Sequence, residues 1–163
     1  MPVEVSFHPE TFEEFFLPVD AKHPGLSGVL KSEFLRYIES RRQLIPSIFG
    51  RDVPYTQPPL AFQACLMHIH ICIPPALFPK NAPQHDRVCK MGRPGDDAAL
   101  IYVQGELYED RYLILAFYGR MRTPKPGIFR PCSIWLDWRK NGAITIDRDY
   151  PKRRRDSRMA GID

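Results

Sequence analysis

Several features that mark particular protein classes are missing from this chain of 163 residues. Its four cysteines, Cys65, Cys72, Cys89 and Cys132, form no CxxC pair and no dense disulfide framework. No apolar run approaches the ~20 residues that span a bilayer. The N-terminus also lacks the basic segment and apolar stretch of a secretory signal. We therefore expect a cytoplasmic protein with reduced thiols and no membrane association.

Acidic side chains are scarce only at the C-terminal end. The net charge of +4 divides into a net of −3 over residues 1–118 and a net of +7 over residues 119–163, which include the run from Lys152 to Arg155. This split predicts one domain over 1–118, followed by a basic extension over 119–163. A basic extension suggests a polyanionic partner, nucleic acid first, although a solvated disordered end fits the charge equally well.

The spacing of apolar residues predicts an α+β fold, with two N-terminal helices packed on one face of a small antiparallel sheet. The helices are expected over Pro9 to Leu17 and Ser27 to Gln43. The strands are expected over Ala64 to Ile73, Ala99 to Leu107 and Tyr112 to Tyr118. Prolines predict an irregular connection before the first strand, and a long loop over 74–97 separates the first two strands.

Polar residues alternate with apolar ones in the first two predicted strands. His68 and His70 share one side of their strand, and Tyr102 and Gln104 share one side of theirs. We expect these four side chains to form a single polar face opposite the helices.

Paired histidines on one face suggest two chemistries. Imidazole exchanges protons near neutral pH, so His68 and His70 are candidates for acid–base catalysis, with Arg51 and Arg93 stabilising a developing phosphorane. The alternative is a zinc site built on His68, His70 and Cys72 and completed by His85 and Cys89, although this spacing is not a familiar zinc pattern. Solvated histidines without a function are a third possibility.

Basic and aromatic side chains suggest RNA binding. Aromatic faces can stack on unpaired bases, and cations neutralise phosphates. A packed aromatic edge with a solubilising turn fits the strand exit equally well, and Arg51 with Asp52 could form only a local ion pair. The candidates in the long loop and at the exit of the last strand are Lys80, Arg87, Lys90, Tyr118, Arg120 and Arg122.

Four segments in series resemble the YafO-type toxins of bacterial type II toxin–antitoxin systems. They are the run Ile45 to Asp52, then His68-Ile69-His70-Ile71, then Arg93 through Asp97 into Leu100 to Gly105, and finally the apolar strand Tyr112 to Phe117. Their order and spacing agree over about residues 30–118. Each motif alone has little specificity, and the series carries the resemblance.

The resemblance implies a RelE/ParE-like domain that acts as a ribosome-dependent mRNA interferase, with a cognate antitoxin, the ribosome and mRNA as partners. In such an enzyme the 2′-hydroxyl of the RNA attacks the neighbouring phosphate, so the resemblance implies neither a metal nor another cofactor. We predict His68, His70 and Arg93 as catalytic residues. The predicted RNA contacts are Arg51, Lys80, Arg87, Lys90, Tyr102, Gln104, Tyr118, Arg120 and Arg122.

The chain departs from the family pattern after Tyr118, where an amphipathic helix would follow. Residues 134–138 and 143–147 are apolar and flank Asn141-Gly142, which predicts a hairpin before a disordered basic tail. This divergence leaves two alternatives to the interferase: a metal-dependent hydrolase that uses the His-x-His-x-Cys strand, and a non-catalytic protein that binds ribosomes or RNA.

Overall fold

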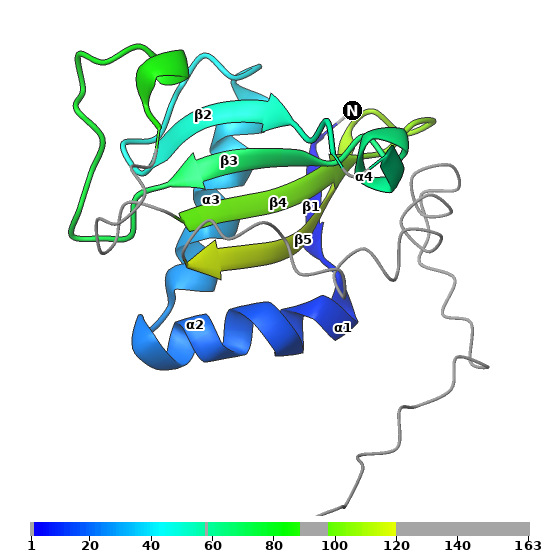
Figure 1. The fold of residues 1–163 in the computed structure, drawn as a ribbon, viewed down its shortest axis with the longest axis horizontal. Helices are drawn as coiled ribbons and strands as arrows, with labels where there is room; N and C mark the ends of the chain where they lie inside the picture. Colours follow the sequence, from blue (N-terminus) through cyan, green and yellow to red (C-terminus); the bar gives the residue numbers. More distant parts are fainter. Residues whose placement is uncertain (1, 58, 89–97, 120–163) are drawn as a thin grey trace, which may run out of the picture.

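The computed structural model describes residues 2–57, 59–88 and 98–119 and shows an α+β fold built on a five-stranded sheet (Figure 1). The strand order is β1-β5-β4-β3-β2. The three predicted strands are confirmed, but the sheet is mixed rather than antiparallel, because β1 pairs with β5 in parallel. The strands are β1 (Glu4–Phe7), β2 (Phe49–Pro54), β3 (Met67–Ile71), β4 (Ala98–Gln104) and β5 (Arg111–Gly119).

The N-terminal helical region is longer than predicted and is not one regular helix. It consists of α1 (Pro9–Thr11), a π-helical segment η1 (Phe12–Phe16) and α2 (Leu17–Lys22). His8 caps α1, since its Nδ1 accepts a hydrogen bond from the Thr11 backbone N–H at 3.4 Å. The remaining helical elements are α3 (Leu26–Glu39), α4 (Pro59–Gln63) and the 3₁₀ turn η2 (Gln84–Asp86).

The predicted second helix is confirmed as α3, which packs its apolar stripe on one face of the sheet. Leu30, Phe34 and Ile38 recur every four residues and are buried. They join Ile69 and Leu100 of the central strands in one hydrophobic cluster. This face of the sheet is called the α3 face below.

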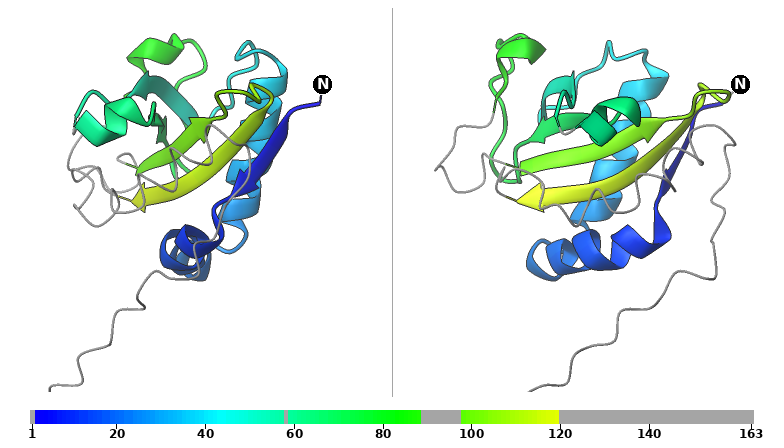
Figure 2. Two further views of the ribbon diagram at one scale, coloured as in Figure 1. Left: turned by 90° about the vertical axis from the view of Figure 1, so that its right-hand side faces the viewer. Right: turned by 45° about the vertical axis from the view of Figure 1, so that its right-hand side comes forward.

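The prediction of a polar second face is wrong. Helix α4 covers part of this face, so helices lie on both sides of the sheet (Figure 2). A second apolar cluster forms here from residues of α4, β4 and β5 and the residues next to them, namely Ala61, Ala64, Leu66, Ala99, Ile101, Val103, Leu113, Leu115 and Ala116. The histidines of β3 lie beside this cluster.

The pairing of β3 with β4 explains the error. Residues directly opposite each other in a sheet share a face, and the register sets Met67 against Tyr102 and His68 against Ile101. Tyr102 and Gln104 therefore lie on the α3 face, opposite to His68 and His70. A long loop joins these strands, so nothing local in the sequence fixes this register.

The structure does not test the predictions for the C-terminal region and the domain boundary. The predicted C-terminal hairpin and tail lie outside the described residues, as does the end of the 74–97 loop, and the division at residue 118 stays a prediction. No helix among the described residues is long and apolar enough to cross a membrane.

Candidate functional site

The candidate site lies on the sheet face opposite α3, where β2 and β3 run side by side. His68 and His70 come from β3, and their ring centroids are 5.5 Å apart. Tyr55 follows β2, and its ring lies 4.5 Å from the ring of His68. We call the surface formed by Arg51, Tyr55, His68, His70 and Tyr118 the histidine face.

Arg51 reaches the histidine face because β2 contains a bulge. The register shifts between Phe49, which pairs with Ile71, and Asp52, which pairs with Ile69. Gly50 and Arg51 are thus both opposite His70. The Arg51 Nε donates a hydrogen bond to the His85 carbonyl at 2.6 Å, and the guanidinium is close enough to His70 to lower the pKa of its imidazole.

Both histidines are held in the neutral form near pH 7. Burial, together with the smaller effect of the neighbouring His70, lowers the pKa of His68 to about 4. Burial also lowers the pKa of His70, with Arg51 adding to the shift. A neutral imidazole has a free lone pair that can accept a proton, while the lowered pKa makes it a weaker base than an exposed histidine.

Tyr118 lies across the sheet from His70, in one row with Ala99 between them. Its ring packs against Phe15 with centroids 5.3 Å apart. Burial raises the pKa of Tyr118 and, to about 12, that of Tyr55, so both hydroxyls stay protonated. His68 Nδ1 and Tyr118 Oη are buried and have no hydrogen-bond partner among the residues that the structure describes.

Asp52 lies on the opposite side of the sheet and does not pair with Arg51. Its side chain is 4% exposed and lies 3.4 Å from Arg42 Nη1. The hydroxyls of Tyr37 and Tyr102 each donate to its carboxylate at 3.0 Å. Burial raises the pKa of Asp52, while Arg42 and the two hydroxyls oppose that shift. The local Arg51–Asp52 ion pair considered from the sequence is therefore absent.

Two predicted RNA contacts belong to this α3 face. Tyr102 is fully buried, and its hydroxyl also accepts a hydrogen bond from Arg42 Nη2 at 3.2 Å, so no ring face is open to a base. Gln104 donates from Nε2 to the Glu109 carbonyl at 2.7 Å. Neither residue lies beside the histidines.

Arg87 is also unsuited to a phosphate contact, because its side chain is buried. The guanidinium binds carbonyls of Ala82, Pro46, Phe49 and Lys80 at 2.9–3.5 Å and thereby pins the 74–88 segment to β2. The Lys80 side chain is exposed. Four further predicted site residues lie outside the described part of the chain: Lys90, Arg93, Arg120 and Arg122.

The three-ligand metal site is not formed by the described residues. No group of three or more His, Cys, Asp or Glu side chains among them could hold a metal ion. Cys72 follows β3 and is buried, and His85 Nε2 is exposed and lies 3.4 Å from Asp86. Cys89, the remaining ligand of that alternative, lies outside the described ranges.

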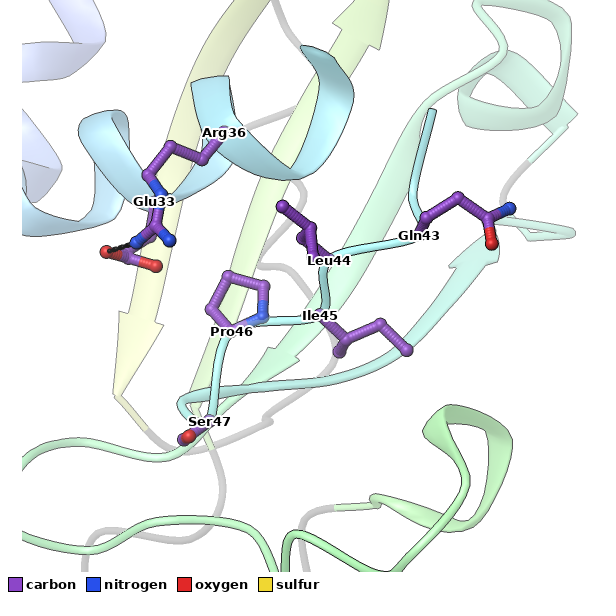
Figure 3. Close-up of a pocket in the computed structure, with 7 residues that line it drawn as sticks. All are labelled: Glu33, Arg36, Gln43, Leu44, Ile45, Pro46 and Ser47. Carbon is purple, nitrogen blue, oxygen red and sulfur yellow. Dashed lines mark hydrogen bonds and ion pairs between the residues drawn. The ribbon is translucent and has the colours of Figure 1, made fainter. Parts of the chain in front are cut away.

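A pocket of about 340 Å³ opens at α3 and the segment after it (Figure 3). Glu33 and Arg36 form an ion pair of 2.9 Å at its edge. Residues 43–47 line the rest, with Leu44 60% exposed. None of the predicted site residues lines this pocket.

The comparison with known families covers every residue of the histidine face. Residues 35–122 match the family described as "Toxin YafO, type II toxin-antitoxin system". The chain belongs to this family. A similar protein is the mRNA interferase toxin YafO of Escherichia coli (strain K12), which is 33% identical over 91 residues. The match covers 53% of this chain and 62% of that relative, and no solved structure matches.

The YafO match also contains residues that sequence reasoning missed. Tyr37, Arg42 and Gln84 combine with Asp52 and Tyr102 on the α3 face, and Gln84 Nε2 donates to Tyr37 Oη at 2.9 Å. Tyr55 was missed on the histidine face. The helical period could have flagged Tyr37 as buried beside Ile38, but only the fold reveals its partner on β2.

Proposed function

We propose that this protein is the toxin of a type II toxin–antitoxin system and acts as a ribosome-dependent mRNA interferase. The observation that carries the proposal is the position of Arg51 beside His68 and His70 on one sheet face, within the stretch that matches the YafO family. The name of the similar Escherichia coli protein, an mRNA interferase, supports the same activity. Since its substrate is translated mRNA, we expect it to act in the cytoplasm.

The proposed reaction uses the RNA as its own nucleophile. The 2′-oxygen attacks the adjacent phosphorus and loses its proton, and the bond from phosphorus to the 5′-oxygen breaks. A neutral His70 or His68 accepts the 2′-proton, since the lowered pKa of each imidazole keeps its lone pair unprotonated before the reaction. This gives a 2′,3′-cyclic phosphate and a 5′-oxygen that takes up a proton.

Arg51 supplies positive charge beside the same histidine. A fixed guanidinium stabilises the charge that develops on the phosphorane oxygens, and its effect is greatest in a site that excludes water. The hydrogen bond from Arg51 Nε to the His85 carbonyl fixes the side chain and leaves its two Nη groups for phosphate. Arg93 remains a predicted second phosphate contact. No step of this reaction requires a metal ion.

Two partners follow from the proposal. A toxin requires a cognate antitoxin to keep its cell viable, and we expect the neighbouring gene to encode it. The ribosome presents mRNA to the enzyme, and the basic residues of 119–163 would contact ribosomal RNA away from the cleavage site.

The test is induced expression of the chain alone, followed by primer extension on mRNA with and without ribosomes. We expect growth arrest and cleavage products that depend on ribosomes. Equal cleavage of free RNA would exclude the ribosome-dependent reaction. Salt-sensitive ribosome binding without cleavage would instead identify a non-catalytic binding protein.

A further inference from the structure

The bulge in β2 decides which side of the sheet carries Arg51. Two residues of β2, Gly50 and Arg51, stand opposite the single residue His70 of β3. Bulges of this kind redirect the side chains that follow them. If β2 continued in regular pairing from Phe49, Arg51 would stand opposite Ile69 on the α3 face. Asp52 would then stand opposite His68, because a shift of one residue exchanges the two faces.

Asp52 stabilises the observed register from the α3 face. It receives hydrogen bonds from Tyr37 on α3 and Tyr102 on β4 and lies near Arg42, which follows α3. Such bonds to a carboxylate are stronger than neutral ones. In the regular register these buried hydroxyls would lose their acceptor, which is costly inside a protein. The network therefore favours the bulged strand.

The outer edge of the bulge is held by the segment around η2. The Arg51 backbone N–H donates to the Arg87 carbonyl at 2.8 Å, and Gln84 Nε2 donates to the Gly50 carbonyl at 3.0 Å. Gln84 also donates to Tyr37 Oη, so the same side chain joins the edge of β2 to the Asp52 network. A Cβ at Gly50 would lie 2.2 Å from the Arg87 oxygen, so this approach requires glycine.

We propose that Asp52 is a positioning residue, which locks the β2 bulge from the α3 face and thereby holds Arg51 beside His70. The effect of this positioning on RNA cleavage rests on the proposed function. Asp52 itself touches no RNA in this scheme, since it lies on the other side of the sheet. The role of Asp52 is to keep Arg51, the proposed phosphate contact, and His70, the proposed proton acceptor, on one face of the sheet.

The test is an NMR titration of His70 in the full chain, which needs no RNA. The variants are Asp52→Ala, Asp52→Asn and Arg51→Gln, with His70→Gln to assign the signal. Arg51 lowers the pKa of His70, and the ring of His68 lies 5.5 Å from that of His70. Arg51→Gln should therefore raise the pKa of His70.

Asp52→Ala should raise the pKa of His70 toward the value in Arg51→Gln, with Asp52→Asn between wild type and Asp52→Ala. The sign is diagnostic, because loss of a carboxylate alone would lower the pKa of a histidine. The double variant Arg51→Gln with Asp52→Asn should show the same His70 pKa as Arg51→Gln alone. If Asp52→Ala does not fold, Asp52→Asn alone carries the comparison.

Asp20→Asn is the matched control for general destabilisation. Asp20 accepts hydrogen bonds from the Ser27 backbone N–H and hydroxyl near the start of α3, far from β2 in the sequence. It should lower stability and leave the pKa of His70 unchanged. An unchanged or lowered His70 pKa in folded Asp52 variants would overturn the proposal.

The cleavage assay provides a second readout. Asp52→Asn should slow ribosome-dependent cleavage by on the order of 10- to 100-fold, as expected when a catalytic group is displaced by about 1 Å. If wild-type protein cleaves nothing but the His70 shifts occur, the proposed function fails while the positioning role of Asp52 stands.

Discussion

Arg51 and Asp52 are neighbours in the chain, yet they serve opposite faces of the sheet. Asp52 accepts hydrogen bonds from Tyr37 and Tyr102 under α3, while Arg51 donates to the His85 carbonyl and lies near His70. The bulge between Phe49 and Asp52 makes this division possible. One face of the domain is thereby anchored, and the other collects the groups suited to RNA chemistry.

The bulge should tolerate no side chain at Gly50. In Gly50→Ala the added methyl would meet the Arg87 carbonyl at 2.2 Å and the Phe78 ring at 2.8 Å. We expect a loss of about 1–3 kcal/mol in the free energy of unfolding, as is typical of overpacked sites. Urea denaturation followed by circular dichroism measures it.

Gly28→Ala is the control for that substitution. Gly28 lies in α3 with nothing within 4 Å of an added Cβ, and alanine favours a helix over glycine by about 0.5–1 kcal/mol. This variant should be stabilised. If Gly50→Ala behaved like Gly28→Ala, the close approach of the 84–87 segment to β2 would be refuted.

Arg87 should matter for stability rather than for RNA affinity. Arg87→Gln removes hydrogen bonds to buried and part-buried carbonyls and should lower the free energy of unfolding by about 1–3 kcal/mol. Lys80→Gln changes an exposed side chain and should alter it by less than about 0.5 kcal/mol. Thermal unfolding of both variants measures these changes in stability. Equal stability together with weaker ribosome binding in Arg87→Gln would instead support the sequence-based prediction that Arg87 contacts RNA.

Stability should fall on acidification because of the buried histidines. The pKa of His68 is about 4 in the folded protein against an ordinary value of 6.5 for histidine, so the unfolded chain binds more protons between these values. The stability that depends on neutral His68 is complete above pH 6.5, falls as the pH drops below that value, and is lost as the pH falls through 4. Urea midpoints at pH 7.5 and pH 5 should differ in this direction.

His68→Gln removes the titrating group and should flatten that pH dependence. Part of the slope should remain, because burial also lowers the pKa of His70 and of His8. A wild-type midpoint that is constant between pH 7.5 and pH 5 would contradict the burial of these imidazoles.

Local patterns in the sequence predicted the elements that carry strong periodicity. Leu30, Phe34 and Ile38 indicated α3, and the apolar alternation around Ile69 indicated β3. β1 was missed because it has four residues and pairs with β5, more than 100 positions later. β2 was missed because Gly50 and Pro54 read as breaks, although the edge of a sheet tolerates proline at the end of a strand.

Local patterns also predicted part of the candidate site, namely the residues whose positions depend on strand alternation. His68 and His70 share a face by strand alternation alone, and Arg51 was predicted as a basic group able to stabilise a phosphorane. The partnership of Asp52 with Tyr37 and Tyr102, and the exclusion of Tyr102 and Gln104 from the histidine face, depend on strand register and on a bulge. Neither is readable from local spacing, because both are fixed by contacts between distant segments.

The central claim is that the histidine face performs the chemistry, and the rate of ribosome-dependent mRNA cleavage by His70→Ala tests it most directly. Gln104→Ala, on the opposite face, is the matched control. We predict that His70→Ala keeps its fold, relieves growth arrest and cleaves about 100-fold more slowly or worse, as loss of a general base entails, while Gln104→Ala stays near wild type. Undiminished cleavage by folded His70→Ala would contradict the account.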